Sequence, residues 1–207
     1  LKSRDQNLEE VILTDVCPYT LGTEVARRDE HGEPHTGFFA PIIHRNSVVP
    51  VSREKTFQPI YERQTRLTLE VYQGENPMVV NNIKLGELDL PLDPRRGIEE
   101  NSVTVRFTYD VNGILQVEAT LVGSGERHEL VLEQNPGLLD PQEIRERLAA
   151  LAKIKVHPRE KQENIAMLAR AERLYEEHLD QREQVQDWIA RFRAVLESQD
   201  EAQIREH

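Results

Sequence analysis

The stretch "SVTVRFTYDVNGILQVEATLV", residues 102–122, has the alternation of a half-buried antiparallel sheet. Val103, Val105 and Phe107 recur at every second position, so in a strand their side chains fall on one face. Asn112-Gly113 supplies a turn that tolerates positive φ. Beyond this turn the apolar positions return with the same period, at Leu115, Val117, Ala119 and Leu121. The stretch therefore predicts a β-hairpin with one apolar face.

Similar patterns lie on both sides of this hairpin. The stretch "RLTLEVYQG" alternates in the same way and places three aliphatic side chains on one side, at Leu67, Leu69 and Val71. "GSG" at 123–125 closes a further hairpin into "RHELVLEQ". About eight candidate strands fit between Thr20 and Gln134, which is enough for two packed sheets. The first two thirds of the chain thus predict an antiparallel β-sandwich.

The composition changes sharply near residue 139. All ten glycines lie between Gly22 and Gly137, and beyond that point the apolar period lengthens to that of a helix. Asp140 followed by Pro141 and Glu143 is a typical helix start, with a capping acceptor, a proline in the first turn and an acid near the positive helix end. The apolar stripes beyond it need covering, so the tail is expected to fold as a small helical bundle.

Charge and composition exclude several classes of partner. The formal net charge of −11, with 30% charged residues, argues against nucleic acid, which needs a basic surface. No apolar run approaches the ~18 residues of a membrane span, so no membrane partner is expected. The single cysteine, Cys17, indicates a reducing compartment, the cytoplasm. The opening "LKSRDQNLEE" has no signal-peptide core and is typical of the end of a helix whose earlier part is missing.

No catalytic or metal-binding set assembles in the sequence. His31 and His35 are close together, but Gly32 and Pro34 intervene and no further ligands complete a shell. Cys17 has no histidine nearby in sequence that could activate it as a nucleophile. Neither of the glycine-rich phosphate-binding motifs, G-x-x-x-x-G-K and G-x-G-x-x-G, is present. We therefore expect no metal site, no cofactor and no enzymatic activity in this chain itself.

Several blocks together resemble a known family. "VILTDVCPYTLGTE", "IIHRNSVVP", "LTLEVYQGE", "KLGELDL", "VTVRFTYDVNGILQVEA" and "GLLDPQEI" are similar, in order and spacing, to the substrate-binding half of DnaK-type heat-shock chaperones. The similarity covers residues 10–150, and it looks most like a divergent member of the HscC type. The nucleotide-binding half of such proteins is absent from this sequence.

The resemblance implies a division into three parts and a fold of β plus α class. Residues 1–15 would be the end of a preceding helix and the interdomain linker, 16–139 a two-layer β-sandwich, and 140–207 an α-helical lid. The linker is "VILTD", in which the resemblance assigns Val11, Ile12, Leu13 and Asp15. ATP and Mg²⁺ would bind the missing domain, and the partners would be that domain, unfolded peptide segments and a J-domain co-chaperone.

The resemblance also implies a peptide-binding site at one end of the sandwich. Carried over position by position, it gives a pocket floor and one neighbour on the second strand: Thr23, Val25, Phe57, Leu67, Leu69 and Phe38. Ala26 and Ile60 would arch over the peptide. Ala26 is smaller than a typical arch residue, so the arch is expected to depend mainly on Ile60 and Tyr61.

Two alternatives stay open at this stage. The apolar side chains assigned to the pocket could instead fill the sandwich core. The segment "RRDEHGEPHTG", residues 27–37, is longer and more charged than the short loop usual in the family, so the domain could instead be an adaptor that docks a fixed partner there. Residues 1–139 carry 14 Lys and Arg against 22 Asp and Glu, a net charge of −8, which favours peptides with basic flanks.

Overall fold

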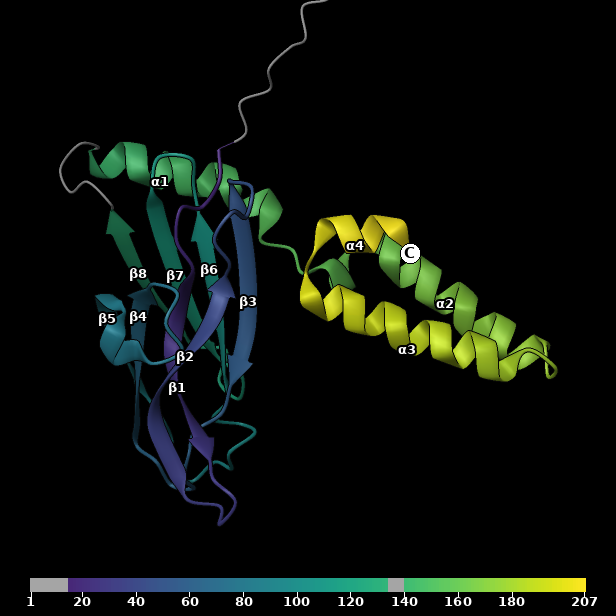
Figure 1. Ribbon diagram of the computed structural model, residues 1–207, viewed down its shortest axis with the longest axis horizontal. Helices are drawn as coiled ribbons and strands as arrows, with labels where there is room; N and C mark the ends of the chain where they lie inside the picture. Colours follow the sequence, from purple (N-terminus) through teal and green to yellow (C-terminus); the bar gives the residue numbers. More distant parts are fainter. Residues whose placement is uncertain (1–14, 134–139) are drawn as a thin grey trace, which may run out of the picture.

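The computed structural model describes residues 15–133 and 140–207, and these contain two four-stranded antiparallel sheets (Figure 1). One sheet has the order β2-β1-β4-β5 and is formed by β1 (Leu21–Arg28), β2 (Pro34–Ile43), β4 (Arg66–Gln73) and β5 (Ile83–Pro91). The other has the order β3-β6-β7-β8 and is formed by β3 (Val51–Phe57), β6 (Val103–Tyr109), β7 (Ile114–Leu121) and β8 (Arg127–Glu133). The predicted sandwich of about eight strands is confirmed.

The hairpin that decides the fold forms the centre of the second sheet. Val105 pairs with Ala119 and Phe107 with Val117, and all four side chains are fully buried. Burying one such valine or phenylalanine side chain contributes about 1.5–3 kcal/mol. The turn between the strands has Gly113 at φ +81°, where a residue with a Cβ would be strained. The hydrophobic core therefore lies between the two sheets, along the alternating positions of the sequence.

The expectation of a long loop over residues 27–37 is wrong. β1 continues to Arg28 and β2 begins at Pro34, so the charged segment is an extension of the hairpin with a five-residue turn, 29–33. Asp29 holds this turn together, because its carboxylate accepts hydrogen bonds from the backbone of His31 and Glu33 at 2.8 and 2.9 Å. Charged side chains are compatible with a strand here because this part of the hairpin is exposed to solvent.

The tail is helical, as predicted. Its helices are α1 (Pro141–Ala150), α2 (Gln162–Glu177), α3 (Arg182–Ser198) and α4 (Glu201–Glu206), with 3-10 turns at Leu151–Ile154 and Pro158–Glu160. Asp140 caps α1 by accepting from the backbone of Gln142 and Glu143, in a complete capping box. α2 and α3 fold back on each other, so the tail is a short bundle and not a single rod (Figure 1).

A glutamine side chain docks the tail onto the sandwich. β3 is an edge strand, and Gln199, between α3 and α4, covers part of its free edge. Its Oε1 accepts from the Glu54 backbone N–H at 3.0 Å, and its Nε2 donates to the Glu54 carbonyl at 2.8 Å. The amide thus makes the two bonds that a neighbouring strand would make. Gln199 has a φ of +56°, a conformation that favours glycine, so the position keeps its side chain at some conformational cost.

Ionic groups surround this contact. The Glu54 carboxylate pairs with Arg106 on β6 and lies 3.5 Å from the guanidinium of Arg159, which in turn pairs with Glu197 at 3.2 Å. His157 is buried beside them, and burial lowers its pKa, with a further lowering by the Arg159 cation. A neutral His157 accepts the Arg159 backbone N–H at 3.2 Å and begins the 3-10 turn that leads to α2.

Replacing Gln199 with leucine is expected to release the tail. The side chain keeps its approximate volume but loses the amide, which leaves a buried N–H and C=O of Glu54 unpaired at a cost of about 1–3 kcal/mol. Amide hydrogen exchange at Glu54 should accelerate about tenfold or more. Gln203→Leu, on the exposed side of α4, is the matched control and should leave the Glu54 rate unchanged. Equal protection of Glu54 in Gln199→Leu and the unmodified chain would contradict the docking role.

Candidate functional site: a groove where the sheet opens

A groove lies where β1 and β4 separate. These strands pair only through Leu21 with Gln73, Gly22 with Tyr72 and Thr23 with Val71. From residue 24 onward, β1 continues with β2 alone, while residues 66–70 of β4 pair with β5 alone. The backbone edges of residues 24–26 and 67–70 therefore face a gap without a strand between them. The gap is a groove of about 770 Å³.

The structure brings seven of the eight predicted peptide-binding residues into the lining of this groove. They come from β1, the end of β3, the following connection and β4: Thr23, Val25, Ala26, Phe57, Ile60, Leu67 and Leu69. Thr23 and Leu69 are buried at the base, and Leu69 belongs to the sandwich core. Phe57 and Leu67 are half-buried and pack against that core. Leu69, Phe57 and Leu67 thus contribute to the core and also line the groove. Their assignment to a pocket and their assignment to the sandwich core are therefore compatible.

Phe38 is the predicted residue that the groove lining does not include. It lies opposite Val25 in the pairing of β1 with β2, and its ring lies under the guanidinium of Arg27, 4.9 Å from centroid to carbon. The pairing is shifted next to this point, where Gly37 adopts a φ of +91°. This irregularity explains why counting along the sequence did not place Phe38. Tyr61, expected at the arch, is largely exposed.

Polar groups at the groove include one acceptor without a partner. Gln64 donates through Nε2 to the Arg66 carbonyl at 2.6 Å, which orients its amide. Its Oε1 is buried and has no hydrogen-bond partner among the residues that the structure describes. A buried carbonyl oxygen left unpaired costs free energy, so a donor from a bound molecule would be favoured there.

Two carboxylates border the groove at the strand edges. Glu24 accepts the Gly37 N–H at 2.8 Å, and Glu70 accepts from Lys84 at 2.5 Å and from the Tyr72 hydroxyl at 2.7 Å. Burial, followed by the hydrogen bond to Glu70, raises the pKa of Glu24. Burial and Glu70 together raise the pKa of Tyr72 to about 12. The β1–β4 border of the groove is therefore acidic, with Lys84 as the cation that compensates Glu70.

Arg28 joins the two sides of the groove, and sequence reasoning did not find it. It ends β1, and its guanidinium donates to the Gly32 carbonyl at 2.7 Å and to the Ile60 carbonyl at 2.8 Å. Gly32 lies in the β1–β2 turn, whereas Ile60 lies in the connection from β3 to β4. One arginine within a run of charged residues carries no signal in a single sequence that would set it apart.

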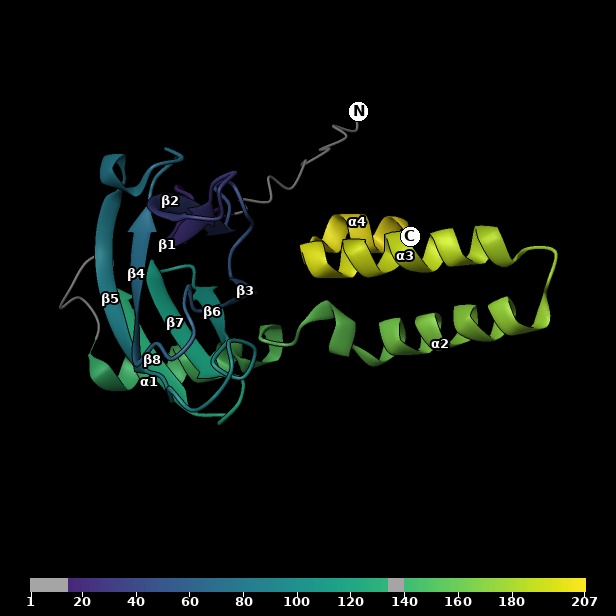
Figure 2. The same ribbon diagram turned by 90° about the horizontal axis from the view of Figure 1, so that it is seen from below.

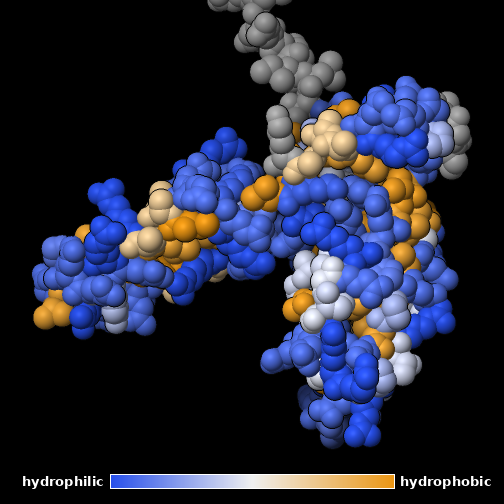
Figure 3. All heavy atoms as spheres, turned by 180° about the vertical axis from the view of Figure 1, so that it is seen from behind, coloured by the Kyte–Doolittle hydropathy of each residue, from blue (hydrophilic) through white to orange (hydrophobic). Residues whose placement is uncertain are grey.

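The helical tail lies beside the groove. Within 15–133 and 140–207, every residue that lines the groove belongs to 23–70, and none belongs to the tail. Figure 2 shows α2 and α3 projecting sideways from the sandwich. Figure 3 shows apolar side chains along this projecting arm, and the exposed ones are Ile165, Met167, Leu174 and Leu179. In this arrangement the groove is open to solvent.

The described chain begins at the last residue of the predicted linker. The Asp15 carbonyl accepts from the Val49 N–H at 3.0 Å, and Val16 forms an antiparallel bridge with Val48. The chain is therefore attached to the sandwich from Asp15 onward. The predicted linker residues Val11, Ile12 and Leu13 lie outside the described residues.

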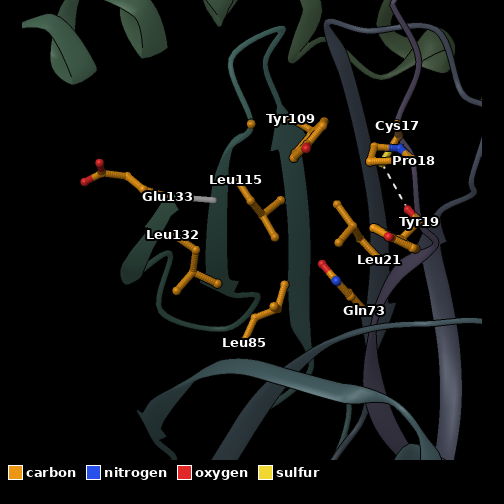
Figure 4. A pocket seen from close by; sticks show the side chains of 11 residues that line it. Cys17, Pro18, Tyr19, Leu21, Gln73, Leu85, Tyr109, Leu115, Leu132 and Glu133 are labelled. Atoms are coloured by element: carbon orange, nitrogen blue, oxygen red, sulfur yellow. Dashed lines mark hydrogen bonds between the residues drawn. The ribbon is translucent and has the colours of Figure 1, made fainter. Parts of the chain in front are cut away.

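A second, smaller cavity of about 240 Å³ lies between the sheets, away from the groove (Figure 4). Leu21, Leu85, Leu115 and Leu132 line it together with Cys17. The Cys17 thiol donates to the Tyr19 carbonyl at 3.1 Å, and burial raises its pKa. Burial is the largest effect on this pKa, so it keeps the thiol protonated and reduces its nucleophilicity.

In the described ranges no three or more His, Cys, Asp or Glu side chains gather in a way that could hold a metal ion. His35 instead pairs with Asp29 at 2.9 Å. No helix of the described part of the chain is both long enough and apolar enough to cross a membrane.

The fold and the groove define a class of protein: a β-sandwich whose sheet is missing one strand at an apolar groove, joined to a helical tail. The family model described as Hsp70 protein matches residues 1–207, and the chain therefore belongs to the Hsp70 family. The chain is thus of chaperone type. This family as a whole carries ATPase activity and generally binds unfolded substrate peptides and co-chaperones.

Cys17 is expected to react slowly with iodoacetamide at pH 8. Its thiol is 1% exposed, so alkylation requires local opening and should be at least about a hundredfold slower than in the urea-unfolded chain. The variant Cys17→Ser with Val16→Cys is the matched control, because position 16 is exposed and should react at nearly the unfolded rate. Rapid labelling of native Cys17 would show that the second cavity opens readily.

Proposed function

We propose that this chain is the substrate-binding domain of an ATP-dependent chaperone and holds short extended hydrophobic segments of unfolded proteins in the groove between β1 and β4. The observation that carries the proposal is the opening of the sheet, where residues 24–26 and 67–70 lack a strand partner on the groove side. An extended peptide can occupy this gap and hydrogen-bond to the exposed backbone edges. Such bonds accept any sequence, because every residue except proline offers the same N–H and C=O.

The side chains of the groove supply the selection for hydrophobic segments. Leu69 forms an apolar base, and Phe57 and Leu67 are half-buried around it. A guest leucine or isoleucine that enters leaves water and would gain about 1.5–3 kcal/mol on full burial. The unpaired Oε1 of Gln64 offers an acceptor for one guest N–H. Unfolded chains expose the side chains that fit this environment, whereas folded proteins bury them.

Charge adds a second preference. Glu24 and Glu70 border the groove, and residues 1–139 carry a net charge of −8. Peptides with Lys or Arg next to the hydrophobic segment are therefore favoured, through attraction that weakens as salt screens it.

In this proposal, a nucleotide-binding domain that binds ATP and Mg²⁺ controls the exchange of peptide in the groove. The "VILTD" segment would connect that domain to the sandwich, and a J-domain co-chaperone would act on the pair. The segment contains three consecutive aliphatic residues, which suits a contact that forms in one nucleotide state and dissociates in another. With one cysteine, which is buried, the chain suits the reducing cytoplasm.

Leu67→Asp or Phe57→Asp is expected to abolish binding of a short leucine-rich peptide flanked by arginine. A carboxylate in the groove must lose its hydration when the guest enters, so affinity should fall by about 2–4 kcal/mol. Fluorescence anisotropy with a labelled peptide measures this directly. Ile83→Asp is the matched control, because Ile83 is an exposed aliphatic residue on β5 outside the groove lining and the charge change is identical. Absence of saturable binding to the unmodified chain at ~100 μM would overturn the proposal.

Leu13→Asp tests the linker in the protein that carries the nucleotide-binding domain. Peptide affinity of the present chain should be unchanged, because the described residues that line the groove all belong to 23–70. In the complete chaperone, ATP should no longer accelerate peptide release, since a charged side chain cannot enter an apolar docking site. Stopped-flow release with and without ATP is the measurement, and Leu8→Asp is the matched control. Undiminished acceleration in Leu13→Asp would refute the linker assignment.

A further inference from the structure

Arg28 bridges the β1–β2 turn and the connection from β3 to β4 across the groove. Its Nη1 is held by the Gly32 carbonyl at 2.7 Å, on the β1–β2 side. Its Nη2 donates to the Ile60 carbonyl at 2.8 Å, on the β3–β4 side. Ile60 lines the groove on one side, and Ala26, two residues before Arg28, lines it on the other. The guanidinium therefore bridges the two sides of the groove.

Of the three side chains expected at the arch, Ile60 lines the groove, but the other two are poorly suited to close it. Ala26 has only a methyl group, and Tyr61 is 58% exposed. Arg28 has the reach that Ala26 lacks, and its planar group offers several donors in a fixed geometry. It contacts the backbone oxygen of Ile60, so the bridge does not depend on the Ile60 side chain.

The neighbouring arginine behaves differently. Arg27 lies over the ring of Phe38, which is outside the groove lining, at 4.9 Å. The two arginines carry the same charge and are adjacent in the sequence, yet only Arg28 is bonded across the groove. This difference separates the effect of the bridge from the effect of a positive charge near the site.

We infer that Arg28 is a strap across the groove that slows the release of a bound peptide. The inference rests on the proposed function. An extended guest in the groove between β1 and β4 would pass beneath the Arg28–Ile60 bond, and this bond must break for the guest to leave sideways. The strap is a positioning and retention element formed by backbone carbonyls and one guanidinium, so it acts on any guest sequence. None of the described tail residues lines the groove, so this bridge would act on a guest without contact from the tail.

The test is a peptide-release measurement with four proteins: the unmodified chain, Arg28→Ala, Arg28→Lys and Arg27→Ala. Release of a fluorescent leucine-rich peptide is followed after addition of excess unlabelled peptide. Loss of charge-assisted hydrogen bonds at an exposed site should raise the release rate of Arg28→Ala about fivefold. Arg28→Lys keeps the charge but cannot hold both carbonyls in the same geometry, so it should also release faster. Arg27→Ala should release at the unmodified rate.

The outcomes separate the two proposals. If the unmodified chain binds no peptide, the proposed function fails, and the strap fails with it. If the unmodified chain binds but Arg28→Ala and Arg27→Ala release equally, the strap is wrong while the groove stands. If Arg28→Lys behaves like the unmodified chain, charge and not bridging controls release, and the strap is also wrong. Circular dichroism and thermal unfolding of each variant establish that the fold is retained, which is expected because Arg28 is exposed.

Discussion

The need to pair backbone N–H and C=O groups at strand edges explains both the groove and the docking of the helical tail in this protein. A sheet is stable when each edge is paired, covered or solvated, and an uncovered edge accepts another strand. Two edges in this sandwich meet that need differently. β1 and β4 separate after Thr23, and the gap between them is the groove. The edge of β3 is covered at Glu54 by the amide of Gln199. One edge is thus unpaired along the groove, and the other is covered by the chain's own tail.

This contrast gives the helical tail a structural role that does not require it to cover the groove. The tail is fixed to the sandwich through Gln199 and through the charges of Glu54, Arg159 and Glu197. It stands beside the groove, and Arg28 bridges the groove itself. A contact of one or two hydrogen bonds contributes only about 1–3 kcal/mol. The Arg28–Ile60 contact and the Gln199–Glu54 contact can therefore each break and form again while the domain stays folded. The proposed retention of a peptide by Arg28 and the docking of the tail by Gln199 therefore depend on different parts of the sandwich.

The sequence was informative where the signal is periodic and local. Val103, Val105 and Phe107 reveal their strand because one face is buried, and Asp140 with Pro141 reveals a helix start because capping uses adjacent residues. The hairpin extension over 27–37 was missed because exposed strands carry charges and resemble loops. Arg28 and Gln199 could not be found, since their partners are 32 and 145 residues away and are backbone atoms without a side-chain signature. The resemblance predicted the groove lining, and of the eight predicted residues only Phe38 lies outside it, next to a shift in strand pairing.

The Gln199 amide could in principle bond to more than one residue along the free edge of β3. In an antiparallel strand, alternate residues direct the same pair of backbone groups to the same edge, so Ser52 and Thr56 present what Glu54 presents. An amide alone cannot distinguish these three positions. The Glu54 carboxylate, fixed by Arg106 and approached by Arg159, is what distinguishes the middle one. The ion pairs of Glu54 thus select one of three equivalent positions on β3 for the Gln199 amide. Binding two residues away would shift the helical arm by about 7 Å along the strand.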